Sequence, residues 1–195
     1  MIAPIDKKAM TTPKWASLCP SWKDQEQMIR ALLTFCLATL MASAPAAAFE
    51  MRAPTEEVVL VFSGEIAVTN QGDTAAFDRA MLEELGGDII VTSTIWTHGV
   101  LEFEGVRLSK LAELLGIESG VFVGFAINDY SVEIPVSDAF DYQPIIAYKR
   151  DGKFMSVRDK GPLWIIYPYD LDPATNTELI FSRSIWQLDR LVVER

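Results

Sequence analysis

The sequence predicts a β-rich α+β domain, in which short strands form a mixed sheet or a barrel-like arrangement with a few short helices. Several stretches of β-branched and apolar residues end at Gly, Pro or Asp, which is typical of short strands. Two other stretches repeat Leu, Met or Phe at every third or fourth residue and end at Gly, which is typical of short helices. An Asp-Gly pair between two extended stretches predicts a tight hairpin.

The first elements are expected in the order strand, helix, strand, helix. Residues 58–62 form the first strand. A helix is expected over 73–85, with Asp73 as its N-cap and a left-handed cap at Gly86-Gly87. A strand over 88–94 follows, and the second helix spans 108–115.

The rest of the chain predicts strands. The expected ranges are 121–127, 131–134, 145–150, 153–157, 164–167 and 184–193. Asn128-Asp129-Tyr130 is expected to turn the chain between the first two of these ranges. Asp151-Gly152 is expected to form a type I′ turn between the next two.

The first 48 residues differ from the rest and have the order of a secretory signal peptide. Arg30 precedes the apolar run 31–42, and small residues continue from there to Ala48. Cleavage is expected near Ala48, which leaves a single domain over 49–195. The protein is then expected in the periplasm.

Two points about this segment stay open. The apolar run is too short for a usual transmembrane helix, but an N-terminal anchor that is never removed is the alternative. Translation from Met28 would place Arg30 near the N-terminus, so both Met1 and Met28 are candidate starts.

The charge balance of the chain is acidic, and the excess of acidic residues lies in 49–195. The chain has 17 Lys and Arg residues against 27 Asp and Glu residues, a net charge of -10, and residues 49–195 alone carry -12. Nucleic acid is therefore not an expected partner, because phosphate contacts need a basic surface. Both cysteines, Cys19 and Cys36, precede the expected cleavage site. The domain then has no disulfide, thiolate nucleophile or thiolate metal ligand.

Four segments, in this order, resemble the oxidoreductase molybdopterin-binding domain, which has the sulfite-oxidase fold. They are Thr-Ser-Thr-Ile-Trp at 92–96, Phe-Glu-Gly-Val-Arg-Leu at 103–108, Lys-Gly-Pro-Leu-Trp at 160–164 with Tyr-Pro at 167–168, and Ser-Ile-Trp-Gln-Leu at 184–188. In enzymes of this family a strand brings a cysteine to molybdenum, and a Lys-Gly-Gly-Pro loop covers the pterin.

The chain departs from this pattern at the metal. The cysteine would fall near Thr92, where the sequence offers only Thr92, Ser93 and Thr94. An alcohol is a poor ligand for molybdenum because it stays protonated and is a harder donor than a thiolate. No metal is therefore expected.

The Thr-x-Thr-x-Trp variant at 92–96 and the Lys-Gly-Pro-Leu-Trp variant at 160–164 resemble the small, cysteine-less, PruR-like periplasmic branch of the family. That resemblance implies a pterin as ligand, and a molybdopterin-like pterin is one candidate. It also implies, as partner, the periplasmic domain of an inner-membrane signalling protein of the GGDEF/EAL or kinase kind, which regulates cyclic-di-GMP. The chain would then be a receptor and not an enzyme. One alternative is a molybdenum-cofactor-dependent oxidoreductase with a non-cysteine metal environment, and another is an interaction module with an empty pocket.

A pterin is flat and polar, so a site for it needs aromatic faces and hydrogen-bonding groups around them. The candidate contacts are Thr92, Thr94, Trp96, Asn128, Asp129, Tyr130, Lys160, Gly161, Trp164, Arg183 and Trp186. The tryptophans would stack on the ring, and Asp129 would face its N-C-N edge. Each group also has an ordinary interpretation: tryptophans pack in cores, Asn-Asp pairs form turns, and charged loops are solvated.

No catalytic residues are assigned. His98 is the only histidine, so a zinc site without cysteine is not predicted. A Ser-His-Asp hydrolase would need His98 together with Ser182 or Ser184, but the chain has no Gly-x-Ser-x-Gly motif.

Overall fold

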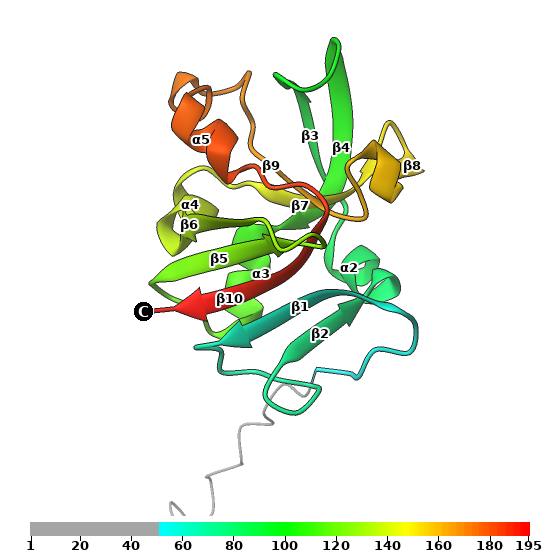
Figure 1. The fold of residues 1–195 in the computed structure, drawn as a ribbon, viewed down its shortest axis with the longest axis vertical. Helices are drawn as coiled ribbons and strands as arrows, with labels where there is room; N and C mark the ends of the chain where they lie inside the picture. Colours follow the sequence, from blue (N-terminus) through cyan, green and yellow to red (C-terminus); the bar gives the residue numbers. More distant parts are fainter. Residues whose placement is uncertain (1–50) are drawn as a thin grey trace, which may run out of the picture. The chain divides into compact units, whose positions relative to one another are not determined.

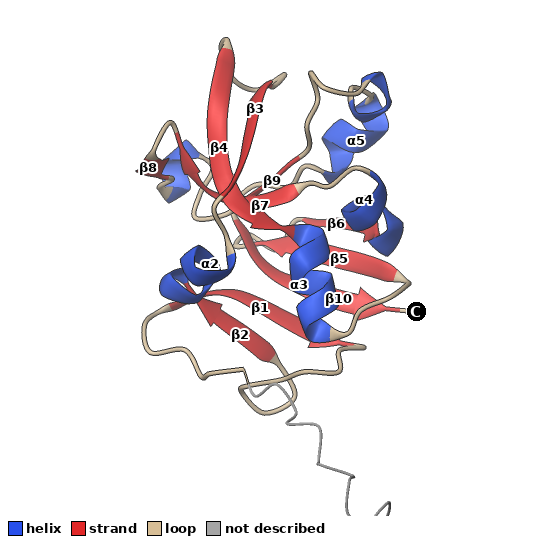
Figure 2. Cartoon of the chain, turned by 180° about the vertical axis from the view of Figure 1, so that it is seen from behind, coloured by secondary structure: helices blue, strands red, loops and turns tan. Residues whose placement is uncertain are grey.

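The computed structural model describes residues 51–195. The expected signal segment, the cleavage site near Ala48 and both cysteines lie outside these residues. The described residues form two five-stranded sheets with short helices around them (Figures 1 and 2). This confirms the predicted β-rich α+β class. The strands of this part of the chain form two separate sheets and no closed barrel.

The first sheet has the order β2-β1-β10-β5-β6. Its strands are β1 (Val58–Gly64), β2 (Ala75–Asp78), β5 (Val121–Ala126), β6 (Ser131–Pro135) and β10 (Leu188–Glu194). β1 runs parallel to β10, and the other neighbours are antiparallel. In β5, every second residue is buried, which is the period of a strand with one face on the core.

The second sheet has the order β3-β4-β7-β8, and β9 also pairs with β7. Its strands are β3 (Asp88–Ser93), β4 (Val100–Arg107), β7 (Ile145–Arg150), β8 (Lys153–Phe154) and β9 (Trp164–Ile166). Asp151 and Gly152, between β7 and β8, both have positive φ, of 49° and 72°. This is the predicted type I′ turn.

Within residues 51–195, four short α-helices pack around the sheets: α2 (Arg79–Leu85), α3 (Leu108–Leu115), α4 (Val136–Asp141) and α5 (Glu178–Arg183). Figure 2 shows α3 lying across the first sheet, and its Leu108, Leu111 and Leu115 are buried there. The predicted range of α3 is confirmed, and Gly116 ends it in the left-handed conformation. Among the described residues no helix is long and apolar enough to span a membrane.

The predicted helix over 73–85 is wrong in its first half. Ala75–Asp78 pairs with β1 as strand β2, because the Ala-Ala-Phe stretch is buried on both faces and the helical spacing of Phe77 is accidental. The N-cap is Asp78, whose carboxylate accepts from the Met81 backbone N–H at 2.8 Å. At the other end Gly86 is not left-handed, and Gly87 takes the positive φ of 97°.

The predicted last strand also begins too early. β10 starts at Leu188, and residues 184–187 form a loop with an isolated bridge to β9, between Trp164 and Trp186. Thr94 similarly lies one residue beyond the end of β3. These two connections lie beside the largest aromatic cluster of the described residues.

Candidate functional site

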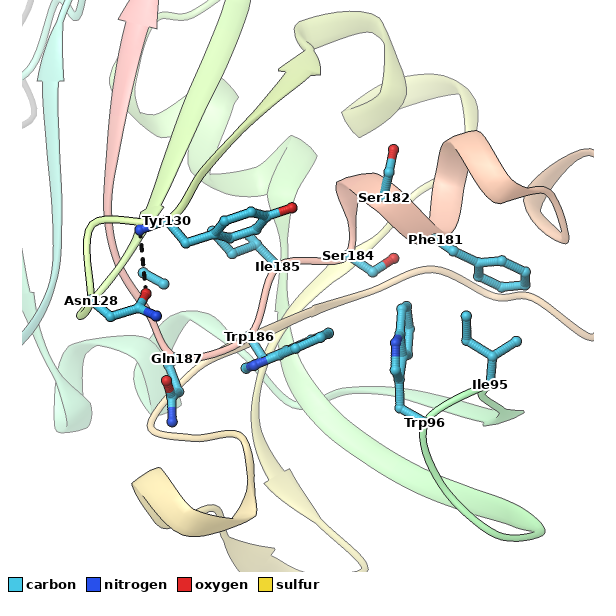
Figure 3. A pocket seen from close by; sticks show the side chains of 11 residues that line it. Ile95, Trp96, Asn128, Tyr130, Phe181, Ser182, Ser184, Ile185, Trp186 and Gln187 are labelled. Carbon is cyan, nitrogen blue, oxygen red and sulfur yellow. Dashed lines mark hydrogen bonds between the residues drawn. The ribbon is translucent and has the colours of Figure 1, made fainter.

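An open cavity of about 490 Å³ lies where three connections meet (Figure 3). They are the turn after β3, the β5–β6 turn, and the segment from α5 to β10. Its lining residues are Ile95, Trp96, Ala126, Asn128, Tyr130, Phe181, Ser182, Ser184, Ile185, Trp186 and Gln187. A cavity of this volume suits a small organic ligand.

Four aromatic side chains line the cavity: Trp96, Tyr130, Phe181 and Trp186. Trp96 lies edge-to-face against Trp186, with 5.5 Å between ring centroids, and against Phe181, at 5.8 Å. The rings come from different connections, and Figure 3 shows those of Trp96 and Trp186 turned towards the same space. Trp186 keeps 36% of its surface exposed. This arrangement leaves an aromatic face that a flat ligand can stack on.

Trp164 lies behind this wall and not on it. It is fully buried, and its indole Nε1–H donates to the Ser184 backbone oxygen at 3.2 Å. Its ring centroid is 5.8 Å from that of Trp96 and 6.3 Å from that of Trp186. Trp164 therefore fixes the two cavity tryptophans from the core side.

The cavity wall also carries polar groups with unused hydrogen-bonding capacity. Asn128 Oδ1 accepts from the Tyr130 backbone N–H at 3.3 Å, and Gln187 Nε2 donates to the Val157 oxygen at 2.8 Å. Within residues 51–195 the Asn128 amide nitrogen and the Gln187 amide oxygen have no hydrogen bond. They offer a donor and an acceptor beside the aromatic faces.

Ser184, at the base of the cavity, is part of a buried chain of hydrogen bonds. Its hydroxyl accepts from the Tyr169 hydroxyl at 2.6 Å and donates to the Ile180 backbone oxygen at 2.8 Å. Burial raises the pKa of Tyr169 to about 12, so this phenol remains a donor at neutral pH. These hydrogen bonds tie Ser184, the first residue after α5, to the core.

Lys160 covers the outer side of the tryptophan cluster. Its Nζ lies 4.1 Å from the Trp186 ring centroid and 5.4 Å from that of Trp164. Partial burial lowers the pKa of Lys160, and the nearby Arg150 charge lowers it further. Lys160 does not line the cavity, but its ammonium group contacts the ring of Trp186, which does.

Gly161 follows Lys160 at a point of close approach. A Cβ on Gly161 would lie 2.1 Å from the Met155 backbone oxygen, so a larger residue would displace the loop. Its N–H donates to the Ser156 oxygen at 2.8 Å. Gly161 therefore shapes the Lys160 loop and is absent from the cavity wall.

The hydroxyls of the two candidate threonines form hydrogen bonds with nearby backbone groups. The Thr92 hydroxyl, fully buried, accepts from the Asp170 N–H at 3.1 Å and donates to the Ser93 oxygen at 3.3 Å. The Thr94 hydroxyl accepts from the Trp96 N–H at 3.2 Å and bonds the Thr97 hydroxyl at 2.7 Å. Neither lines the cavity, but Thr94 holds the turn that carries Trp96.

Asp129 and Arg183 are engaged elsewhere. Asp129 lies in the turn next to Asn128, but its carboxylate accepts from Arg190 at 2.7 Å and is largely exposed. Arg183 pairs with the buried carboxylate of Asp138 at 2.9 Å, and Tyr167 donates to the same carboxylate at 2.9 Å. Neither Asp129 nor Arg183 lines the cavity, although the Arg183 pair fixes the end of α5.

Of the eleven candidate contacts, the structure places Trp96, Asn128, Tyr130 and Trp186 in the cavity wall. Trp164 and Lys160 contact the wall from outside. The lining residues that the sequence interpretation missed include Phe181, Ser182 and Gln187. Only Gln187 carries a sequence signal, because it follows Trp186 in the fourth family segment; the two α5 residues reach the cavity through tertiary packing.

The donor set around Thr92 does not fit a cysteine-bound molybdenum centre. Residues 51–195 contain no cysteine, and the Thr92 hydroxyl is used by two backbone groups. Within the same residues no three His, Cys, Asp or Glu side chains lie close enough to hold a metal ion. The aromatic wall and free amide groups do fit a flat heterocycle such as the pterin ring.

Comparisons with known proteins support the fold. No protein-family model and no curated protein sequence matches the chain. Among solved structures, the chain is similar to the sulfane dehydrogenase SoxCD from Paracoccus pantotrophus, with a TM-score of 0.50 and 14% identity. The match covers 74% of this chain but only 40% of the SoxCD chain. This distant similarity concerns the fold alone.

Proposed function

We propose that the chain is a periplasmic receptor that binds a pterin in the aromatic cavity and signals its presence to a membrane-bound regulator of cyclic-di-GMP. The observation that carries the ligand assignment is the pairing of open tryptophan faces with unused amide groups in one cavity. The fold similarity supports it, because the sulfite-oxidase fold holds a pterin-type cofactor. The partner and the location rest on the sequence resemblance and the signal-like N-terminus.

The chain's own residues would hold the ring as follows. Trp186 would supply the stacking face, with Trp96 and Phe181 enclosing the ring from the side. The Asn128 amide nitrogen would donate to the ring's carbonyl edge, and the Gln187 amide oxygen would accept from its amino edge. Two neutral amides suit an uncharged ring, whereas the carboxylate of Asp129 is taken by Arg190.

Mass spectrometry of the small molecule released on denaturation is the direct test. Protein purified from the periplasm of the source cells is expected to release one equivalent of a pterin. Elemental analysis of the same sample separates the receptor from the enzyme alternative. A stoichiometric amount of molybdenum would overturn the proposal in favour of an oxidoreductase with a non-cysteine metal environment.

A substitution of Trp186 tests the site itself. Trp186→Ala removes the stacking face, which is worth about 1–1.5 kcal/mol, and we therefore expect roughly tenfold weaker binding of tetrahydrobiopterin. Isothermal titration calorimetry under anaerobic conditions measures the dissociation constant. The matched control is Phe154→Ala, because Phe154 is a similarly exposed aromatic residue (43%) outside the cavity wall.

The control must keep the affinity of the unmodified protein. Equal affinities for the Trp186 and Phe154 variants would contradict the cavity assignment. If tetrahydrobiopterin neither binds nor raises the melting temperature of the unmodified protein, and no pterin is released on denaturation, the interaction-module alternative replaces the receptor.

The signalling part has its own test. Deletion of the gene in the source organism is expected to change the cellular level of cyclic-di-GMP, and the Trp186→Ala allele is expected to fail to restore it. Restoration by that allele would separate signalling from ligand binding and contradict the proposal.

A further inference from the structure

The outer edge of β3 is not paired with another strand. β3 pairs with β4 on one side only, and it ends the second sheet. The Ser93 N–H points to the unpaired side, where it donates to Asp170 at 2.5 Å. Backbone groups alternate along a strand, so Ile89 and Val91 also turn their N–H and C=O groups to this side. Within the described chain these groups have no hydrogen-bond partner.

A groove runs along this free edge. Its volume is about 650 Å³, and its opposite wall is the segment between β9 and α5, which Figure 1 shows facing β3. Three apolar side chains stand on the two walls: Ile89 is 51% exposed, Val91 61% and Leu171 85%. Exposed β-branched residues on an unprotected edge are the feature that most β proteins avoid, unless the edge binds another strand.

The groove is negatively charged. Asp141 and Asp172 line it and make no ion pair among the described residues, and the only basic lining residue, Arg107, is paired with Asp88 at 3.1 Å. A second copy of this chain would bring the same negative charge to the edge, which opposes self-pairing. A positively charged occupant would be attracted.

We propose that this edge binds an extended, apolar segment of a partner protein that carries basic residues at its ends, and that the segment joins the second sheet beside β3. The backbone of Ile89 and Val91 supplies the hydrogen bonds, the exposed apolar side chains pack on the segment, and Asp141 and Asp172 select its charge. This site is separate from the aromatic cavity, with which it shares no lining residue. The inference therefore stands without the pterin assignment.

A fluorescein-labelled peptide of alternating valine and threonine, with two lysines at each end, is a suitable probe. Fluorescence anisotropy is expected to show saturable binding to the unmodified protein. The same peptide with glutamates in place of the lysines is expected to bind at least tenfold more weakly. N-methylation of every second residue blocks one backbone edge of the peptide. Of two such peptides, methylated at the odd or at the even positions, one is expected to lose binding.

The protein variants locate the site. Val91→Pro removes an outward N–H that β4 does not use, so the strand can stay folded while the edge loses a donor. Val91→Lys keeps the backbone hydrogen-bonding groups of β3 and adds a positive charge to the edge, which repels the lysines of the peptide. Both are expected to weaken peptide binding at least tenfold with an unchanged melting temperature, whereas Trp186→Ala is expected to leave it intact.

Three results would overturn the inference. The first is equal binding of the lysine and glutamate peptides, and the second is unchanged binding to Val91→Lys. The third is a concentration-dependent dimer in analytical ultracentrifugation that Val91→Lys dissolves, because the edge would then serve self-association.

Discussion

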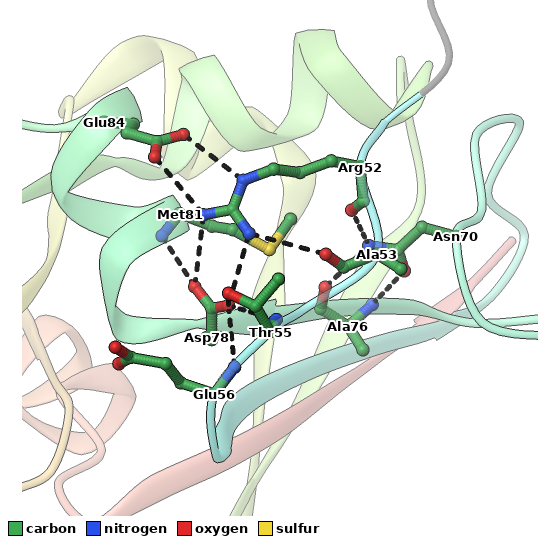
Figure 4. A network of polar contacts seen from close by, with 9 residues as sticks. All are labelled: Arg52, Ala53, Thr55, Glu56, Asn70, Ala76, Asp78, Met81 and Glu84. Atoms are coloured by element: carbon green, nitrogen blue, oxygen red, sulfur yellow. Dashed lines mark hydrogen bonds and ion pairs between the residues drawn. The ribbon is translucent and has the colours of Figure 1, made fainter.

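The aromatic cavity and the polar cluster around Asp78 are both built from side chains of separate elements, but they leave different amounts of hydrogen-bonding capacity. In the cluster, Asp78 is fully buried and accepts from the backbone N–H groups of Met81 and Thr55 at 2.8 Å and of Glu56 at 3.3 Å (Figure 4). Arg52 also pairs with it at 3.3 Å. Both carboxylate oxygens of Asp78 are therefore used within the protein.

The cavity differs because its amides are only partly used. Asn70 in the cluster makes three hydrogen bonds of 2.8 Å, to the Arg52 oxygen and to both backbone groups of Ala76. Asn128 in the cavity makes one, at 3.3 Å. In residues 51–195 no buried side-chain polar atom lacks a partner, so the unused groups of the cavity face solvent. The cluster therefore contributes stability, and the cavity offers contacts to a ligand.

The largest effect in this comparison is expected from Asp78→Ala. The change removes the N-cap of α2 and leaves three backbone N–H groups and Arg52 without their acceptor. The lost cap, with its buried Met81 donor, and the two partly buried donors of Thr55 and Glu56 together predict a loss of about 3–4 kcal/mol in the free energy of unfolding. For a domain of this size the melting temperature is expected to fall by about 10 °C, measured by circular dichroism.

Glu84→Ala is the matched control, because Glu84 contacts Arg52 at the same cluster but is mostly exposed. Its cost is expected to stay below about 0.5 kcal/mol. A similar loss for the two variants would mean that the Arg52 ion pairs, and not the backbone hydrogen bonds of Asp78, stabilise this region.

A smaller effect is expected from acid. Burial alone would raise the pKa of Asp78, but its hydrogen bonds with Met81, Thr55, Arg52 and Glu56 outweigh burial and hold the pKa at about 2, below the ordinary 3.8. The folded state therefore binds this proton less readily than the unfolded state. The stability from Asp78 is complete above about pH 4 and is lost as the pH falls towards 2.

Urea unfolding at a series of pH values measures this loss. The unmodified protein is expected to lose more stability between pH 4 and pH 2 than Asp78→Asn, which cannot titrate at this position. Parallel curves for the two proteins would show that other carboxylates control the acid response.

Periodicity and turn chemistry predicted most of the fold. The Asp-Gly turn, α3 and the β5–β6 pair depend on local signals, namely positive φ, a capping glycine and alternating burial. The helix over 73–85 was wrong where local spacing conflicted with tertiary pairing, because β1 recruits Ala75–Asp78 as its neighbour. Pairing between strands far apart in sequence leaves no periodic signal of its own.

The site was harder to predict for a related reason. Trp96 and Trp186 could be named because each belongs to a recognisable segment. Phe181 lies on α5 and reaches the cavity through tertiary packing, to which the Arg183–Asp138 pair at the end of the helix contributes. Asp129 looked suitable by chemistry, yet it pairs with Arg190, which lies 61 residues away in the sequence. A sequence shows which groups exist and does not show which of them are already used.

The smallest stability change and the most specific binding change are expected from Asn128→Ala. Its single weak hydrogen bond to Tyr130 predicts a change in unfolding free energy within about 0.5 kcal/mol, whereas loss of its donor to a bound ring would cost about 1 kcal/mol. We therefore expect roughly fivefold weaker binding of tetrahydrobiopterin at an unchanged melting temperature.

Asn70→Ala is the matched control and should behave in the opposite way, with about 1–2 kcal/mol lost from stability and no change in affinity. If the two asparagine variants instead lose stability and affinity in parallel, the cavity and the cluster are not separate in function, and the distinction between used and unused polar groups does not identify the ligand site.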